Sequence, residues 1–304
     1  MKRIVFFLAF ALVSWSCVQK KQKLLVDVGD SLTAGAGGYG ISMSSVASSF
    51  LGSDWEVLNM GVGGENTLTI GARFGAMPMF FKDTILITKN DTLYEISQGL
   101  FSSYNGKQVN PLRQGKSGIK SIYINDKKYV LEFSKDLETY FISRTEAGDN
   151  TIDIIMPNTL VETELSKIKS DVTTIFIGQN NGYETPEDYM KQLDLFVEKV
   201  GHDQYIIITS HLNCKEEIRL LVKEEYGDKY IDLKNYFPNQ AIYDAIELGL
   251  LEDDGTYPTE EDLELMTKGR TPKSLTVDGV HFNKVGYTLL GRLRYQKGKE
   301  LGYW

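Results

Sequence analysis

The 304-residue sequence has little histidine, little cysteine and no excess of basic charge, and each shortage excludes a class of function. The formal net charge is −8, which argues against a nucleic-acid partner, because neutralising phosphates requires a basic surface. The three histidines and two cysteines form no cluster with the spacing of metal ligands, so we expect neither a metal nor another cofactor. The apolar content of 42% and the length suit a packed protein of one large domain, alone or with a smaller companion.

The N-terminus differs in composition from the rest of the chain. The segment "MKRIVFFLAFALVSWSC" has two cations, an apolar run over residues 4–13 and small serines before Cys17. The run is shorter than the about 20 residues that a membrane span needs. This pattern is typical of a secretory signal, and the cysteine at its end resembles the lipidation site of a bacterial lipoprotein.

We therefore expect residues 1–17 to be a lipoprotein signal peptide that ends in a lipidated Cys17, and residues 18–23 to be a short tether. The protein would be exported and held at the bacterial cell envelope by this lipid anchor, its only contact with a membrane. Ordinary secretion with an incidental Cys17 is the alternative. With Cys17 acylated, Cys214 has no partner, so no intramolecular disulfide is expected.

Apolar runs alternate with helical patterns over residues 24–80 and 161–304. This alternation predicts an α/β fold: a doubly wound, mostly parallel sheet flanked by helices, with its site beyond the carboxyl ends of the strands. The predicted strands are 24–28, 55–60, 172–178, 204–210 and 229–233, and the predicted helices are 186–200, 215–226, 236–250 and 285–297.

The middle of the chain, residues 81–160, has a different rhythm. Short alternating segments such as "KKYVLEFS" and "NTIDIIM" are separated by Asn-Asp and Asn-Gly pairs, which supply the chemistry of tight turns. We expect an antiparallel β subdomain inserted into the α/β domain and bordering the substrate cleft.

The stretch "VDVGDSLTAG" runs from a buried strand into Ser31. A serine exposed at the end of a strand acts as a nucleophile only when a base accepts its proton and donors stabilise the oxyanion. Among the three histidines, His281 follows Asp278 by three residues, a spacing that lets the carboxylate orient the imidazole. We expect His202 to be a surface residue and His211 at most to line the site.

Two further loops offer hydrogen-bond donors to an oxyanion. "NMGVGGENT" (59–67) follows the second strand and contains Gly61, Gly63 and Gly64, while "IFIGQNNG" (175–182) contains the side-chain amide of Asn180. Since the carboxyl ends of parallel strands meet at one sheet edge, we expect these groups to converge near Ser31.

These segments resemble the sequence blocks of SGNH/GDSL-family hydrolases, a class of esterases and lipases with a flavodoxin-like fold. Gly29-Asp30-Ser31-Leu32 matches the first block with its serine nucleophile, and alignment from Asn59 places the oxyanion glycine at Gly64. Gly178-Gln179-Asn180-Asn181 matches the third block, except that Asn181 replaces the usual aspartate. The fifth block is Asp278-Gly279-Val280-His281, and the four blocks occur in family order over nearly the whole mature chain.

The resemblance implies a Ser31–His281–Asp278 triad and an oxyanion hole formed by Ser31, Gly64 and Asn180. Structural alternatives remain for each site: Ser31 as a helix cap, Asp278 and His281 as loop residues, the glycines as turn residues and Asn180 as a cap. Possible substrate-binding residues are Arg73, for which a structural salt bridge is the favoured alternative, together with Asn181 and His211.

The expected activity is hydrolysis of a small-molecule or glycan ester, with O-deacetylation of a carbohydrate as the first hypothesis. Tyrosines of the insert could present aromatic edges to sugars, although packing within the strands is the favoured alternative; they are Tyr94, Tyr104, Tyr123 and Tyr129. A lipase or lysophospholipase is the rival and would need an apolar groove, for which residues 74–81 are the local candidate. A non-catalytic glycan-binding lipoprotein on the same fold is the third hypothesis.

Overall fold

The computed structural model describes residues 21–88, 93–113, 121–145 and 152–304. The predicted signal peptide, Cys17 and tether residues 18–20 lie outside the described residues. Within the described ranges, none of the helices combines the length and the apolarity that crossing a bilayer requires.

The central sheet has five parallel strands in the order β15-β14-β13-β1-β2. Their bounds are β1 (Lys23–Gly29), β2 (Trp55–Gly61), β13 (Val172–Ile177), β14 (Tyr205–Thr209) and β15 (Tyr230–Ile231). This is the 2-1-3-4-5 strand order of flavodoxin-like sheets, in which the order reverses between β1 and β13. Crevices for ligands form at this reversal, beyond the carboxyl ends of the strands.

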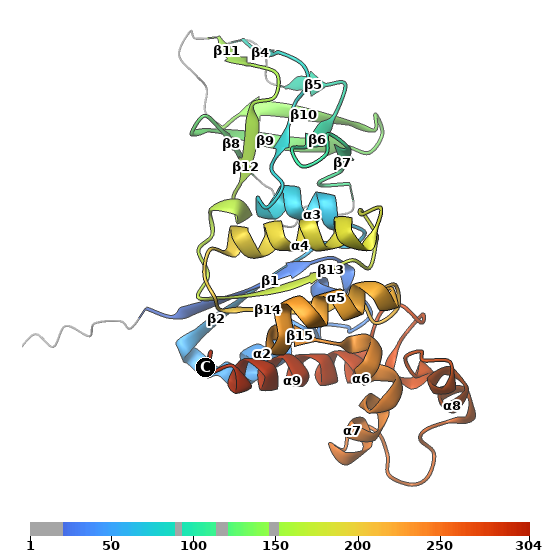
Figure 1. The fold of residues 1–304 in the computed structure, drawn as a ribbon. Helices are drawn as coiled ribbons and strands as arrows, with labels where there is room; N and C mark the ends of the chain where they lie inside the picture. The colour runs from blue at the N-terminus through green and yellow to red at the C-terminus, as the bar shows by residue number, and fades with distance from the viewer. Residues whose placement is uncertain (1–20, 89–92, 114–120, 146–151) are drawn as a thin grey trace, which may run out of the picture.

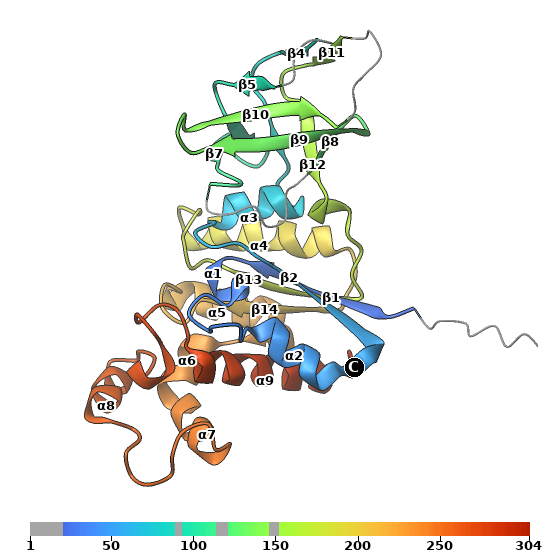
Figure 2. The same ribbon diagram turned by 180° about the vertical axis from the view of Figure 1, so that it is seen from behind.

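Helices cover both faces of the sheet, as predicted (Figure 1, Figure 2). One apolar core joins the sheet to α3 (Thr67–Phe74), α4 (Pro186–Val200) and α5 (Glu216–Tyr226). The other joins it to α1 (Ser31–Ala34), α2 (Met43–Leu51), α6 (Leu233–Asn239), α7 (Ala241–Glu247) and α9 (Lys284–Glu300). Short 3-10 turns lie at Gly52–Asp54, Leu165–Lys167, Gly227–Lys229 and Lys273–Leu275.

The helix predicted over 236–250 is two helices, α6 and α7, so this prediction was wrong. Asp232 caps α6 by accepting the N–H of Asn235 at 3.1 Å, which starts the helix three residues earlier than predicted. Pro238 cannot donate a backbone hydrogen bond, and Gln240 leaves helical geometry at φ −128°. The helix α8 (Glu260–Thr267) was not predicted, although Thr259 and Asp262 form its capping box.

The inserted antiparallel subdomain is present, and its strands run from Met79 to Thr163. Eight strands form one sheet in the order β5-β10-β9-β8-β12-β3-β6-β7, and β4 pairs with β11. The bounds are β3 (Met79–Phe80), β4 (Ile85–Ile87), β5 (Tyr94–Ile96), β6 (Leu100–Ser102), β7 (Gln108–Val109), β8 (Ile122–Ile124), β9 (Lys127–Ser134), β10 (Thr139–Arg144), β11 (Asp153–Ile155) and β12 (Leu160–Thr163).

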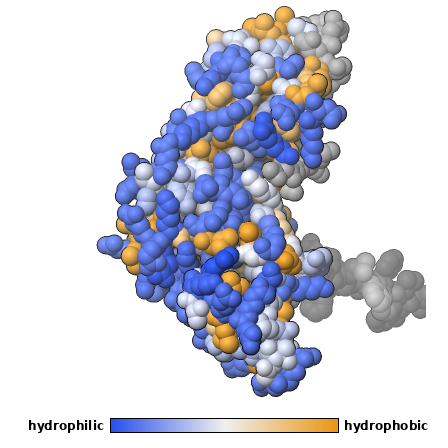
Figure 3. Space-filling model, turned by 90° about the vertical axis from the view of Figure 1, so that its right-hand side faces the viewer, coloured by the Kyte–Doolittle hydropathy of each residue, from blue (hydrophilic) through white to orange (hydrophobic). Residues whose placement is uncertain are grey.

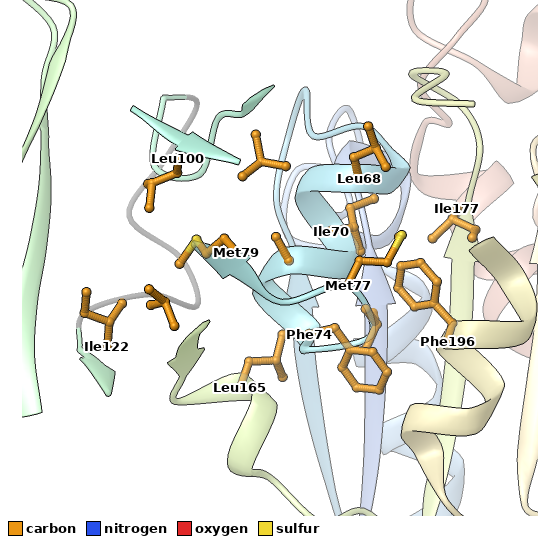
Figure 4. Packing of buried hydrophobic residues seen from close by; sticks show 14 of the residues in the cluster. Leu68, Ile70, Phe74, Met77, Met79, Leu100, Ile122, Leu165, Ile177 and Phe196 are labelled. Carbon is orange, nitrogen blue, oxygen red and sulfur yellow. The ribbon is translucent and has the colours of Figure 1, made fainter. Parts of the chain in front are cut away.

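The insert is packed onto the α/β domain through α3. Figure 4 shows Phe74 of α3 among side chains from both parts of the molecule, including Met79 of the insert and Phe196 of α4. Polar contacts accompany this shared core: the N–H of Asn110 donates to Thr69 Oγ1 at 3.3 Å. The helix α3 begins just after the glycine loop at the carboxyl edge of the sheet. The insert therefore packs against a helix that adjoins this edge.

A buried ion pair crosses the other face of the sheet. Asp27 in β1 and Arg294 in α9 are both fully buried, with Oδ1 and Nη1 at 3.3 Å, and Ser44 donates to Asp27 at 2.7 Å. Burial lowers the pKa of the Arg294 guanidinium, which shows that the charge has lost water. The pair links the strand that carries Ser31 to the C-terminal helix.

We predict that Arg294→Met lowers the free energy of unfolding by about 3–5 kcal/mol, because it leaves the Asp27 carboxylate buried without a counter-charge. The double variant Asp27→Leu/Arg294→Met should recover most of this loss. Denaturant titration of both, with the exposed Lys299→Met as control, checks the effect. Equal stability of Arg294→Met and the control would contradict it.

Candidate active site

Ser31 lies at the carboxyl end of β1, on the first residue of α1. Asp30 caps this short helix by accepting the N–H of Leu32 at 2.9 Å. Gly29 is required at the turn, because a Cβ there would lie 2.1 Å from Thr33 Oγ1 and 2.3 Å from the Phe176 carbonyl oxygen. The strand end therefore packs tightly and fixes the direction of Ser31.

The structure brings Ser31, His281 and Asp278 into one chain of hydrogen bonds. Nε2 of His281 lies 3.0 Å from Ser31 Oγ, and its Nδ1 lies 2.8 Å from Asp278 Oδ2. With Nδ1–H donating to the carboxylate, Nε2 offers its lone pair to the serine hydroxyl. The spacing is that of a nucleophile, a base and an orienting acid.

The Asp278 carboxylate is held as an anion. Its pKa is lowered to about 2, mainly by the backbone N–H of His281, which donates to Oδ1 at 2.7 Å. The N–H of Val280 donates to the same oxygen at 2.9 Å. The group is ionised throughout the neutral range and can stabilise an imidazolium on His281.

The predicted oxyanion donors come from the two loops beside Ser31. A Cβ built on Gly63 would lie 3.8 Å from Ser31 Cβ, so Gly63 lies directly beside Ser31. Gly64 follows it, exposed and with φ +73°, in the left-handed region that favours glycine. The half-buried Asn180 donates one amide N–H to the Glu65 carbonyl at 3.1 Å, which leaves its second N–H for a ligand.

Arg73 does not face the substrate, which corrects the substrate-binding alternative for this residue. Its side chain is fully buried and pairs with Glu65 at 2.8 Å. The guanidinium also donates to the carbonyl oxygens of Met60 at 2.7 Å and Gly29 at 3.2 Å. Arg73 thus fastens the ends of β1 and β2 to the glycine loop.

His211 is also unavailable to a substrate, because only 2% of it is exposed. Its ring nitrogens lie 2.7 Å from Thr271 Oγ1 and 2.8 Å from the carbonyl oxygen of Val280. Burial lowers the pKa of His211 to about 4, so the ring is neutral near pH 7. It holds the loop that carries Asp278 and His281.

Asn181, which replaces the usual aspartate, is exposed at φ +57°, a conformation that asparagine tolerates well. Its carbonyl oxygen accepts the N–H of Thr67 at 3.0 Å, which joins the third loop to the start of α3. The backbone therefore accommodates the replacement without strain. Substrate binding by the Asn181 side chain stays a prediction.

The insert approaches the Asn180 loop through the turn between β6 and β7. Tyr104 Oη donates to Asp188 at 2.6 Å, and Lys107 pairs with Glu184. The other insert tyrosines also have contacts within the protein: Tyr129 is buried, and the ammonium of Lys167, just after the insert, lies 3.7 Å from the centre of the Tyr123 ring. The packing alternative is thus favoured over a row of sugar-binding edges.

Two buried carboxyl groups beside the site, those of Asp30 and Glu65, were not predicted to belong to it. Asp30 is 1% exposed, and burial raises its pKa to about 7 despite the N–H of Leu32 and the nearby His281. Burial also raises the pKa of Glu65, which the Arg73 guanidinium opposes. The sequence could have indicated Asp30, because it is a favoured capping residue directly before Ser31. The contacts of Glu65 could not be predicted, because they form only when the chain is folded.

Among the residues that the structure describes, no group of three or more histidine, cysteine and acidic side chains could hold a metal ion.

No protein-family model and no curated protein matches the chain. Among the solved structures that are similar to it, two are covered over nearly their whole length. The lipase/acylhydrolase from Enterococcus faecalis is 17% identical, with 92% of this chain and 97% of that chain covered and a TM-score of 0.42. A protein from Desulfitobacterium hafniense assigned to the G-D-S-L family of lipolytic proteins is 13% identical, with 91% and 99% covered and a TM-score of 0.43.

We predict that Asp30 makes stability pH-dependent. Between its ordinary pKa of 3.8 and about 7, the folded state keeps a proton on Asp30 that the unfolded state releases. Stability should fall as pH rises through this window and level off above it. From pH 4.5 to 7.5 the loss attributable to Asp30 is on the order of 3 kcal/mol.

Thermal or denaturant unfolding of Asp30→Asn at these two pH values measures the effect, since asparagine can still cap Leu32. The variant should lose less stability than the wild type over the interval. Exposed Asp254, whose pKa lies below the window, is the control: Asp254→Asn should keep the wild-type slope. An identical slope in Asp30→Asn would contradict the prediction.

Proposed function

We propose that the protein is a serine ester hydrolase of the SGNH/GDSL type. The observation that carries this proposal is the continuous hydrogen-bond chain from Ser31 Oγ through His281 to Asp278, with contacts of 3.0 and 2.8 Å. It lies at the carboxyl edge of a parallel sheet with the 2-1-3-4-5 order, where sites of this fold class form. A helix cap or an incidental loop contact would not require all three groups in line.

In the proposed reaction, His281 Nε2 takes the proton of Ser31 as Oγ attacks the acyl carbonyl. The Ser31 N–H, a glycine N–H of the 63–64 turn and the second Asn180 N–H donate to the tetrahedral oxyanion. The imidazolium then gives its proton to the leaving alcohol, which departs and leaves an acyl group on Ser31. Water, deprotonated by His281, attacks this ester, and the acid leaves as Ser31 regains its proton.

We propose O-acetylated carbohydrate as the substrate. A lipid substrate needs an apolar groove, and residues 74–81 were the candidate segment for it. Phe74, Met77 and Met79 are buried in the core (Figure 4). Phe81 is buried as well. Figure 3 views the molecule from the side toward which β1 runs in Figure 1 and shows a mostly hydrophilic surface with scattered apolar residues. A short acyl group on a polar alcohol suits such a surface better than a long acyl chain.

We also propose that the enzyme works outside the cytoplasm, anchored to the cell envelope by a lipid on Cys17. This proposal depends on the N-terminal sequence pattern alone. The alternative is a non-catalytic glycan-binding lipoprotein, which would show no hydrolytic activity.

Ser31→Ala should abolish hydrolysis of p-nitrophenyl acetate and leave a folded protein, since it removes the hydroxyl nucleophile and keeps the Cβ. Initial rates and the thermal midpoint of unfolding measure the two effects. Ser49→Ala, an exposed serine of α2, is the control and should keep the wild-type rate. Activity retained in Ser31→Ala would exclude Ser31 as nucleophile, and an inactive wild type would favour the glycan-binding alternative.

Asp278→Asn should lower kcat by about 10²–10⁴-fold and change KM little, because it disturbs the orientation and charge stabilisation of His281. Steady-state kinetics on p-nitrophenyl acetate separate the two constants. An unchanged kcat would remove Asp278 from the mechanism.

A further inference from the structure

Tyr39 is the most exposed large hydrophobic side chain in the described ranges, at 79%. It lies in the glycine-rich loop after α1. The N–H of Ile41 donates to the Gly38 carbonyl at 3.0 Å and closes a turn in which Tyr39 has φ +48° and Gly40 has φ +93°. Positive φ at both central positions is the pattern of type I′ turns, where asparagine and glycine are usual.

Neither the backbone nor the core explains a tyrosine at this position. A bulky residue at positive φ is strained, and Tyr39 is the only aromatic residue with positive φ in the described part of the chain. The exposed ring gains nothing from burial. Strained residues of this kind occur at ligand contacts, where an interaction with another molecule offsets the cost.

The loop is held against the base of the proposed triad. A Cβ on Gly37 would lie 3.2 Å from His281 Cβ and 2.7 Å from the Phe282 carbonyl oxygen, so the two loops touch. Tyr287 Oη donates to the Ala36 carbonyl at 2.9 Å, which fixes the loop to α9. Tyr39 therefore projects from a rigid support two residues away from the contact with His281.

The contact between Gly37 and His281 puts the loop that carries Tyr39 on the His281 side of the site. His281 protonates the leaving alcohol, so the alcohol portion of the ester must lie on the His281 side of Ser31. In the proposed reaction the acyl oxygen lies on the other side, where the 63–64 turn and Asn180 offer N–H groups. An exposed aromatic ring on the alcohol side suits a flat, ring-shaped alcohol such as a sugar, which can stack on it.

We propose that Tyr39 is a substrate-contact residue that selects esters with a ring-shaped alcohol portion, a sugar in the proposed reaction. This inference rests on the proposed function and deepens it. The tyrosine sets specificity for the alcohol and contributes nothing to recognition of the acyl chain.

The test compares kcat/KM for a mono-O-acetylated methyl glucoside with that for methyl acetate, which shares the acyl group and lacks the ring. Tyr39→Asn should lower the ratio of the two values roughly 3–10-fold, as expected for a lost stacking contact. Tyr39→Phe keeps the ring and should keep the ratio within about 2-fold. Because Asn-Gly favours the type I′ turn, Tyr39→Asn should unfold at the wild-type temperature or above it.

Tyr243→Asn makes the same change at a tyrosine that is 45% exposed on α7 and should leave the ratio unchanged. An unchanged ratio in Tyr39→Asn would overturn the inference, whether both kcat/KM values stay the same or both fall by the same factor. The proposed function would remain intact. A wild-type protein that hydrolyses neither ester would contradict the proposed function. The inference about Tyr39 would then be wrong as well.

Discussion

The hydrogen bond between Ser31 and His281 joins two residues that lie 250 positions apart, and the rest of the site depends on it. Ser31 is delivered by β1, and His281 by a loop before α9. A bridge between Thr276 and Phe282, with the N–H of Val277 donating to the His281 carbonyl at 2.9 Å, closes that loop on itself. The hydrogen bond therefore requires that this narrow loop be placed correctly beside the end of β1, a strand from the other end of the chain.

Buried polar groups hold these loops, and the hydration free energy that each group loses differs from one group to the next. The Arg73–Glu65 pair lies almost wholly out of water, but each charge has a partner and Arg73 satisfies two strand-end carbonyls. For Asp30, desolvation outweighs the Leu32 N–H and the nearby His281 and raises the pKa of the carboxyl group. His211 avoids the cost by staying neutral while it holds the Val280 carbonyl.

Much of the fold could be predicted from the sequence, because short buried runs and capped helices are local signals. Thr185-Pro186 marked the start of α4 correctly, and Asn125-Asp126 forms the turn between β8 and β9 with positive φ at both residues. The sequence pattern merged α6 and α7, since apolar spacing continues across Pro238. For the candidate site, the order of motifs predicted which groups meet, whereas the buried positions of Arg73 and His211 depend on packing between distant elements.

The most direct test of the central claim is reaction of the purified protein with a fluorophosphonate, followed by mass spectrometry of its peptides. Such a probe forms a bond only with a serine that a neighbouring base activates. We predict one covalent adduct, located on Ser31 and absent from protein unfolded before labelling. A folded protein that remains unlabelled, or one labelled on a different serine, would contradict the assignment of Ser31, His281 and Asp278 as a working triad.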